Sequence, residues 1–327
     1  MASKQDYHHV YTRIGSGFCG TVWAKGIEDL AIKREDGGPS RSLTNDFTMH
    51  KRALDAFLKL SCIERRDRDE LLQTQVRIPQ CYSFLTPHDT WWKKNLASFP
   101  PGYSSCNAIC SERIPPFPEN TRTLLVERYC PAEIRDQILS SASNRACLIR
   151  PYIGRKRTYG TGTNARSRFR GFSLQNYPLH LDQMVELGIP SDHIDHYAAM
   201  MGEALATLHW LGEIDGNDIE FVLAPLPTPD DGNTAAMTNV LGRHTLWMLD
   251  FDLCRSMTMD LEGVEQAITA FRRNDPFYPR PNTHQWVAFR RQYLQTSMTL
   301  GFSFNTEEAE SRLDLARKFI DLLETNK

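Results

Sequence analysis

The chain has 327 residues, of which 41% are hydrophobic and 24% charged, and its formal net charge is −2 at pH 7. This composition is typical of a globular protein and excludes a collagen-like or largely disordered chain, while the length is sufficient for two lobes or one large domain. Because the N-terminus lacks an apolar leader and no run of about 18 apolar residues occurs, we expect a cytoplasmic protein without a membrane partner.

Residues 11–35 are predicted to form a β-hairpin with a glycine-rich turn. From Gly15 to Val22 the sequence fits the pattern G-x-G-x-x-G-x-V, and Lys33 ends the short apolar run that follows. Glycines in this pattern let backbone amides approach phosphate groups, and the whole spacing is typical of a protein-kinase N-terminal lobe. The alternative is an ordinary glycine-containing hairpin. The candidate nucleotide-binding residues are Gly15, Gly17, Gly20 and Lys33.

A helix is predicted over residues 43–60, where apolar side chains recur at helical spacing. Asp46 lies near its start, where protein kinases carry a glutamate that pairs with the lysine of the preceding strand. We therefore expect an ion pair between Asp46 and Lys33, which would belong either to a binding site or only to the structure.

The next segment marks the expected division into two lobes. Residues 82–120 are rich in proline, serine, asparagine and aromatic residues, which predicts a loop or an insertion. Residues 123–126 resemble the strand before a kinase hinge, so the lobes would divide near 127–131. The predicted domains are an N-terminal lobe over 1–130, with the insertion, and a C-terminal lobe over 131–327.

The stretch 145–170 is strongly basic and contains no acidic residue. The near-neutral net charge gives the whole chain no attraction for a polyanion such as DNA, but this stretch could bind RNA phosphates with salt-sensitive affinity. The alternative is a solvated or disordered loop. Its basic residues are Arg145, Arg150, Arg155, Lys156, Arg157, Arg166, Arg168 and Arg170.

Two long helices are predicted in the C-terminal lobe. Residues 194–211 carry an apolar stripe at helical spacing that is typical of a long buried helix. Residues 307–323 repeat the pattern and are expected to close the lobe.

Residues 208–223 follow a predicted long helix, as a kinase catalytic loop does, but the residue types at the catalytic positions differ. A phosphotransferase needs an aspartate that accepts a proton and, five residues later, an asparagine that holds magnesium. No asparagine lies five residues after Asp215 or Asp218. Asp250 stands where kinases carry their metal-binding aspartate, but Asp252 replaces the glycine of that motif. The sequence therefore favours a kinase-like fold more strongly than it favours kinase chemistry.

The acidic residues of these two loops are expected to meet at the cleft between the lobes. Such a cleft suits a cation, either magnesium held by oxygen ligands or a guanidinium bound through two parallel hydrogen bonds. The alternative is that individual acids cap turns or form salt bridges. The residues concerned are Asp215, Asp218, Glu220, Asp250 and Asp252.

The eight cysteines are scattered, and only Cys106 and Cys110 are close in sequence. A Cys-x3-Cys pair could be half of a zinc site, but no second pair follows at the required spacing. We therefore predict reduced thiols and no metal.

Four segments in order, YPLHLDQM at 177–184, DGNDIEFVL at 215–223, LWMLDFD at 246–252 and NDPFYPRP at 274–281, together resemble fungal kinase-like proteins often labelled zinc-finger proteins. The resemblance extends over residues 147–300. This group includes the arginine-containing cyclodipeptide synthases, which join arginine from arginyl-tRNA to a second aminoacyl residue and release a cyclic dipeptide for secondary metabolism.

The expected fold is α+β, a two-lobed protein-kinase-like fold with a small β-rich N-lobe and a larger helical C-lobe. The resemblance implies a cyclodipeptide synthase whose partners are arginyl-tRNA and a second aminoacyl-tRNA. An aminoacyl ester is already activated, so the reaction needs positioning and a base for an α-ammonium of pKa about 7.7–8.0, and no cofactor.

We assign catalysis to Asp215, Asp218 and Glu220, substrate binding to Asp250 and Asp252, and tRNA binding to the basic stretch. The alternatives are a phosphotransferase that uses ATP and magnesium at the glycine-rich turn, and a pseudokinase scaffold.

Overall fold

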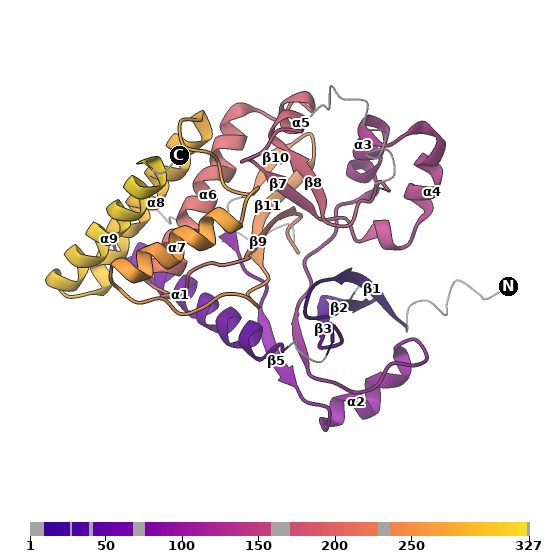
Figure 1. Ribbon diagram of the computed structural model, residues 1–327. Helices are drawn as coiled ribbons and strands as arrows, with labels where there is room; N and C mark the ends of the chain where they lie inside the picture. The colour runs from indigo at the N-terminus through magenta and orange to yellow at the C-terminus, as the bar shows by residue number, and fades with distance from the viewer. Residues whose placement is uncertain are drawn as a thin grey trace.

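The computed structural model describes residues 10–26, 28–38, 42–67, 76–157, 171–227 and 236–325. It shows a mixed α/β structure with a β-sheet part and a larger, mainly helical part (Figure 1). Within these residues, no helix is both long and apolar enough to cross a membrane.

The N-terminal part is built on a five-stranded antiparallel sheet. Its strands are β1 (Tyr11–Ser16), β2 (Thr21–Lys25), β3 (Leu30–Arg34), β5 (Cys81–Leu85) and β6 (Ala108–Glu112), in the spatial order β1-β2-β3-β6-β5. The predicted hairpin is confirmed. In its turn, Gly20 has a φ of 154°, and a Cβ atom there would overlap the carbonyl oxygen of Arg34, so only glycine fits.

Helix α1 (Thr44–Asp67) confirms the predicted helix and connects the two parts of the molecule (Figure 1). At its start, Phe47 packs against Phe84 of the N-terminal sheet. Further along, Ala53, Phe57 and Leu60 are buried in the main core with the helical part. The helix therefore fixes the position of the sheet relative to the rest of the chain.

The prediction of a loop over 82–120 is wrong in part, whereas the alternative of an insertion stays a prediction. This segment contains most of β5, all of β6, the short helix α2 (Thr90–Asn95) and the 3-10 turn η2 (Leu96–Ser98). Its aromatic residues pack around the buried guanidinium of Arg34, which lies 4.8–5.1 Å from the ring centres of Trp92, Phe99 and Tyr103. The residues that suggested a loop therefore cover the outer end of the sheet.

The strand predicted at 123–126 is also wrong, because these residues belong to helix α3 (Glu119–Tyr129). Leu125 and Val126 are fully buried as adjacent residues of this helix. The chain leaves the N-terminal sheet at Glu112 and reaches the main core at Phe117. The crossing segment is thus 113–118, earlier than the predicted division at 127–131.

A second sheet lies in the helical part. Its strands are β4 (Val76–Arg77), β7 (Ile149–Tyr152), β8 (Tyr177–His180), β9 (Glu220–Ala224), β10 (Met237–Asn239) and β11 (Gly242–Leu249). The spatial order is β10-β11-β9-β7-β8, and β4 pairs in parallel with β11. The pairing of β9 with β11 places Glu220 opposite Leu249, at the end of the sheet that faces the N-terminal part.

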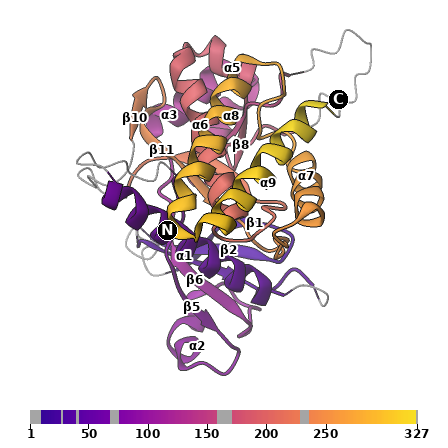
Figure 2. The same cartoon turned by 90° about the vertical axis from the view of Figure 1, so that its left-hand side faces the viewer.

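The remaining helices surround this second sheet (Figure 2). They are α4 (Arg135–Ser140), α5 (Leu181–Glu186), α6 (Ser191–Trp210), α7 (Leu261–Arg273), α8 (His284–Leu300) and α9 (Thr306–Thr325), with 3-10 turns η3 (Ala132–Ile134), η4 (Ser143–Arg145) and η6 (Gly301–Ser303). Helices α6 and α9 confirm the two long helices predicted in this region.

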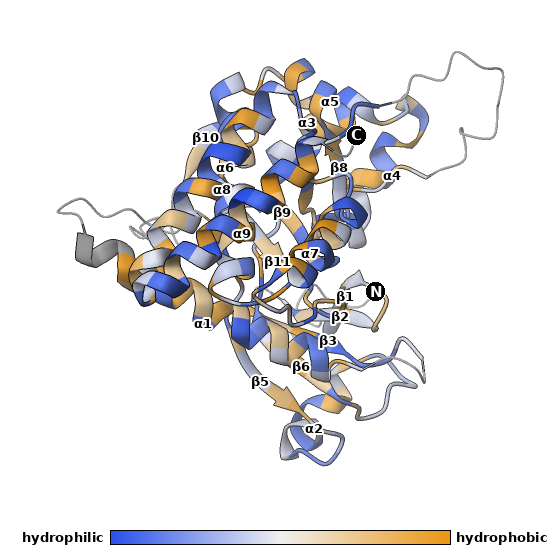
Figure 3. Cartoon of the chain, turned by 60° about the vertical axis from the view of Figure 1, so that its left-hand side comes forward, coloured by the Kyte–Doolittle hydropathy of each residue, from blue (hydrophilic) through white to orange (hydrophobic). Residues whose placement is uncertain are grey.

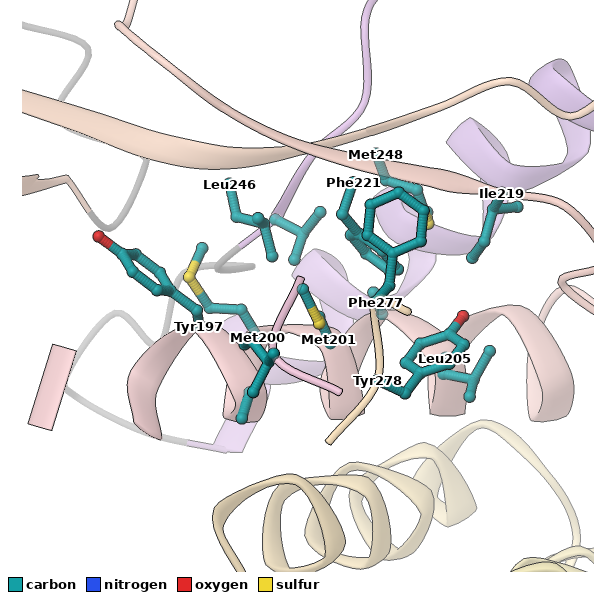
Figure 4. Close-up of a cluster of buried hydrophobic side chains, with 14 of the residues drawn as sticks. Tyr197, Met200, Met201, Leu205, Ile219, Phe221, Leu246, Met248, Phe277 and Tyr278 are labelled. Atoms are coloured by element: carbon teal, nitrogen blue, oxygen red, sulfur yellow. The ribbon is translucent and has the colours of Figure 1, made fainter. Parts of the chain in front are cut away.

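Helix α6 is the centre of the core. Its residues Met201 and Leu205 pack beneath Phe221 of β9 and Met248 of β11 (Figure 4). On its other side, α8 approaches so closely that a Cβ atom on Gly202 would overlap the backbone of α8. Along α7, α8 and α9, hydrophilic and hydrophobic residues alternate (Figure 3), as expected for helices that cover a core with one face.

Candidate functional site

A cavity of about 170 Å³ lies between the N-terminal sheet and the second sheet. One side is formed by the glycine-rich turn, β2, β3 and α1, and the other by the crossing segment, β7, β9 and the end of β11. Gly15 and Gly17 line it, whereas Gly20 serves the close approach to β3 described above. The cavity therefore lies where the sequence predicted a cleft.

Lys33 is held between two carboxylates in this cavity. Its Nζ atom lies 2.6 Å from Oδ2 of Asp46 and 2.6 Å from Oδ1 of Asp250. The predicted ion pair with Asp46 is confirmed. Burial opposes the charge on the ammonium, but the two carboxylates outweigh it and raise the pKa of Lys33. Lys33 is therefore charged at physiological pH.

Asp250 has a different electrostatic balance. It follows β11 with a φ of 66°, a conformation that non-glycine residues seldom adopt. Burial, together with the negative charges of Asp46 and Asp252, raises the pKa of Asp250 to about 7, even though Lys33 acts in the opposite direction. The site thus contains a carboxyl group that can exchange a proton near neutral pH.

Glu220 forms a second ion pair in the cavity. Both of its carboxylate oxygens accept hydrogen bonds from Nη2 of Arg150, each at 2.5 Å. Burial raises the pKa of Glu220, and Arg150 opposes this shift. The sequence predicted Arg150 as a tRNA contact, whereas its side chain lines the cavity and binds Glu220, a predicted catalytic residue.

Asp218 lies outside the residues that line the cavity, but it interacts electrostatically with Arg150 and Lys33, which do line it. It is exposed, and no hydrogen bond or ion pair of its carboxylate is found within the described part of the chain. Its φ of 63° is maintained by the buried Asn274, whose Oδ1 accepts the Asp218 backbone N–H at 2.7 Å. Partial burial, reinforced by the charge of Asp252, raises the pKa of Asp218.

Asn274 is a positioning residue that the sequence reasoning missed. Its side-chain nitrogen donates to the carbonyl oxygens of Gly216 and Ile219, on either side of Asp218. Asn274 belongs to the segment 274–281, which carries part of the family resemblance. That resemblance was the one feature of the sequence that pointed to Asn274 as a residue of the site.

Asp215 does not reach the cavity, contrary to the prediction of a catalytic role. It is completely buried and accepts hydrogen bonds from the backbone and Nε of Arg255 and from Nε2 of Gln266. A carboxylate whose oxygens are already bound in this way orients the loop and cannot contact a substrate.

The segment 250–256 connects several N-terminal elements to the second sheet. The Cys19 thiol, in the glycine-rich turn, donates a hydrogen bond to Oδ2 of Asp252 at 3.0 Å. Asn45 of α1 donates to the carbonyl oxygen of Asp252, and Arg52 of α1 donates to Oγ of Ser256. Burial, with this bond to Asp252, raises the pKa of Cys19 to about 12. Asp252, which accepts the Cys19 hydrogen bond, is largely buried, with only 8% of the residue exposed.

The basic stretch is partly neutralised by acidic neighbours. Arg155 binds Asp275, and Arg157 binds Asp182 and Glu186. Lys156 is exposed, and Arg145 is exposed at the end of η4. Arg166, Arg168 and Arg170 lie outside the described residues. The stretch therefore offers fewer unpaired cations than its sequence suggests.

The label of a zinc-finger protein finds no matching site in the described residues. They contain no group of three or more His, Cys, Asp or Glu side chains placed to hold a metal ion. Cys110 is buried within β6, and Cys106 lies before that strand. This pair does not fit a structural zinc site.

Comparison with known proteins gives limited similarity. The family model "DUF3669: Zinc finger protein" matches residues 246–302, which include the segment 250–256, α7 and α8. No curated protein matches the chain. Among solved structures, the chain is weakly similar to one described as "Structure of the microcompartment-associated aminopropanol kinase", with 12% identity, 98% of this chain and 94% of that chain covered, and a TM-score of 0.19.

Proposed function

We propose that the chain is an arginine-containing cyclodipeptide synthase with a two-lobed, protein-kinase-like fold. The glycine-rich turn, the pair of Lys33 with Asp46 and the position of Asp250 after β11 support a kinase-like ancestry. The resemblance of the four segments supports the aminoacyl-transfer activity.

The charge of the cavity is the observation that carries this proposal. Its lining holds the carboxylates of Asp46, Glu220 and Asp250 and the cations of Lys33 and Arg150, together with Glu112, which pairs with Arg77. Asp218 and Asp252 do not line the cavity, but they interact electrostatically with these groups and add negative charge. An excess of negative charge favours a cationic substrate and disfavours an unaccompanied nucleoside triphosphate. Arginine linked to tRNA brings two cationic groups, its guanidinium and its α-ammonium.

The reaction requires no group beyond carboxylates and two charged tRNAs. One α-ammonium loses a proton, and its nitrogen attacks the ester carbonyl of the other aminoacyl-tRNA while the ribose hydroxyl leaves with a proton. The second amine then attacks the remaining ester, which closes the ring and releases the second tRNA. A carboxylate of raised pKa suits the proton transfer because its pKa approaches that of the amine.

Asp218 is the residue we assign to the substrate cation, as guanidinium ligand or proton acceptor. It is exposed, its pKa is raised, and its carboxylate retains its hydrogen-bonding capacity. Glu220, Asp250 and Asp252 maintain the negative field around it. Asp215 and Asn274 keep the loop in position. Arg145 and Lys156 remain candidate contacts for tRNA phosphates.

The proposal is tested with purified protein, charged arginyl-tRNA and each other aminoacyl-tRNA. Mass spectrometry should detect a cyclic dipeptide that contains arginine, and ribonuclease treatment should abolish it. Asp218→Asn should remove the product. Asp314→Asn is the matched control, because this acid on α9 is 74% exposed and pairs only locally with Arg317. Absence of product with all partners contradicts the proposal.

A phosphotransferase that uses ATP and magnesium is the second candidate, favoured by the pairing of Lys33 with both Asp46 and Asp250 under the glycine-rich turn. Magnesium-dependent ATP turnover that disappears in Lys33→Ala would support it. ATP turnover without cyclic dipeptide formation would replace the first proposal with this one.

A further inference from the structure

The cavity has an apolar end as well as the charged end described above. On the side of the N-terminal sheet, the apolar end is lined by Ile14, Val22 and Ala31, which we call the upper wall. On the side of the second sheet it is lined by Ile114, Leu148 and Leu249, the lower wall. A space bounded by aliphatic side chains from two different sheets fits a flat, apolar-faced ring.

The lower wall has a fixed base. Ile114, Leu148 and Leu249 are only partly buried, but they pack on a fully buried cluster that includes Val222 and Trp247. A wall supported in this way retains its shape when no ligand is present, so binding requires little ordering of side chains.

Strand register places the two ends of the cavity side by side. In the pairing of β3 with β6, Ala31 lies opposite Ser111, next to the crossing segment, and Lys33 lies opposite Ile109. Ala31 and Lys33 are two residues apart and share one face of β3, which separates them by about 7 Å along the strand. The cavity thus changes from apolar to charged over roughly the extent of a ribose.

The end of a charged tRNA has the same order as the cavity, an apolar group followed by a charged one. Its amino acid is esterified to the ribose of a 3′-terminal adenosine, so a flat purine, a sugar and a cationic amino acid follow one another. A purine has two apolar faces and a polar edge, and the polar residues Ser111 and Glu112 line the same cavity next to Ile114. The 5′ oxygen of this adenosine carries one phosphodiester, with a single negative charge, where ATP would bring a triphosphate.

We propose that the apolar end of the cavity binds the 3′-terminal adenosine of an aminoacyl-tRNA and thereby places the amino acid at the carboxylates around Asp218. This inference rests on the proposed function and specifies which part of the tRNA enters the site. It also gives the glycine-rich turn a function that does not involve a triphosphate.

The test uses 3′-arginylamino-3′-deoxyadenosine, an amide that cannot react, with adenosine, cytidine and argininamide as separate probes. Titration calorimetry should show that the conjugate binds more tightly than either half, that adenosine competes with it, and that cytidine binds more weakly than adenosine. Equal binding of cytidine and adenosine, or no competition by adenosine, would overturn the inference.

Variants separate the two ends of the cavity. Ile114→Ala should weaken adenosine and the conjugate by about tenfold, because part of the lower wall is lost, and leave argininamide unchanged. Asp218→Asn should weaken argininamide and the conjugate but not adenosine. Val287→Ala, which removes an aliphatic side chain that is 63% exposed on α8, should change none of the affinities. Leu148→Ala repeats the first test if Ile114→Ala has an altered circular dichroism spectrum.

Product formation, measured on the same preparations, distinguishes the two possible failures. Cyclic dipeptide formation without adenosine competition would refute the adenosine site and leave the proposed function intact. Adenosine binding without product from any pair of charged tRNAs would refute the proposed function, and with it the assignment of the apolar end of the cavity to tRNA.

Discussion

Replacing Lys33 by alanine would leave the carboxylates of Asp46 and Asp250 next to each other without the cation that separates them. The ammonium lies 2.6 Å from both, and the side chains of Lys33, Asp46 and Asp250 are 16%, 4% and 24% exposed. Water can therefore screen little of the repulsion that the substitution creates.

The magnitude follows from this burial. Removing one partner of a buried ion pair typically costs about 3–5 kcal/mol, because a charge is left without compensation. In Lys33→Ala, Asp250 can instead take up a proton, since its pKa is already raised to about 7 and loses the opposing effect of Lys33. We therefore expect a loss of about 3 kcal/mol in the free energy of unfolding at pH 8, near the lower limit of that range.

The sign of the pH dependence is also fixed. A carboxyl whose pKa is higher in the folded protein favours folding most at low pH, and this contribution is lost as pH rises through the folded pKa. The cost of Lys33→Ala should therefore be smaller at pH 5, where Asp250 is protonated, than at pH 8.

Urea unfolding followed by tryptophan fluorescence at both pH values measures the effect. Lys25→Ala on the neighbouring strand is the matched control, because its ammonium lies 3.9 Å from the half-exposed Glu28. The Lys25 side chain is 20% exposed, but its pair with Glu28 is long and Glu28 is open to water, so this pair should contribute no more than about 1 kcal/mol. Equal costs for the two variants, or a larger cost for Lys33→Ala at pH 5, would refute the reasoning.

Three further predictions test other features of the site. Asp215→Asn should lower the free energy of unfolding by about 2–4 kcal/mol, because the new amide group places a donor against buried donors. Asp218→Asn should change the free energy of unfolding by no more than about 0.5 kcal/mol. Chemical denaturation of both variants measures these changes, and a larger loss for Asp218→Asn than for Asp215→Asn would contradict the prediction. Gly20→Ala should lower the free energy of unfolding by about 2–4 kcal/mol, measured in the same way, since its Cβ atom overlaps the carbonyl oxygen of Arg34. In the wild-type protein, Asp250 should make the free energy of unfolding fall as pH rises from about 4 to about 7, because burial raises its pKa from the usual 3.8. Asp250→Asn should therefore reduce the pH dependence of the urea midpoint over that interval. An unchanged pH dependence in this variant would count against a raised pKa of Asp250.

The parts of the site that sequence predicted correctly depend on local patterns. The hairpin and the pair of Lys33 with Asp46 follow from glycine spacing and from a short connection between a strand and a helix. Such features need little information about distant residues, because chain geometry alone brings the partners close.

The errors concern residues whose environment is set by distant partners. Asp215 was expected in the cleft, but Arg255, forty residues later, binds it in the interior. Arg150 was predicted to contact tRNA, but from β7 its guanidinium binds Glu220. Residues 123–126, three of them apolar, were predicted as a strand, since a short apolar run does not distinguish a strand from a buried helix. Burial of a charge depends on the final packing, which one sequence does not reveal.

The segment that follows β11 has a consequence for how the protein unfolds. Within residues 250–256, Asp250 binds β3, Asp252 binds the glycine-rich turn, and Ser256 binds α1. This short segment therefore holds contacts to both parts of the molecule. Unfolding of either the N-terminal sheet or the second sheet breaks contacts that the segment makes with the other. We expect heat denaturation to proceed in a single cooperative transition, in which the calorimetric and van't Hoff enthalpies agree, instead of two successive meltings.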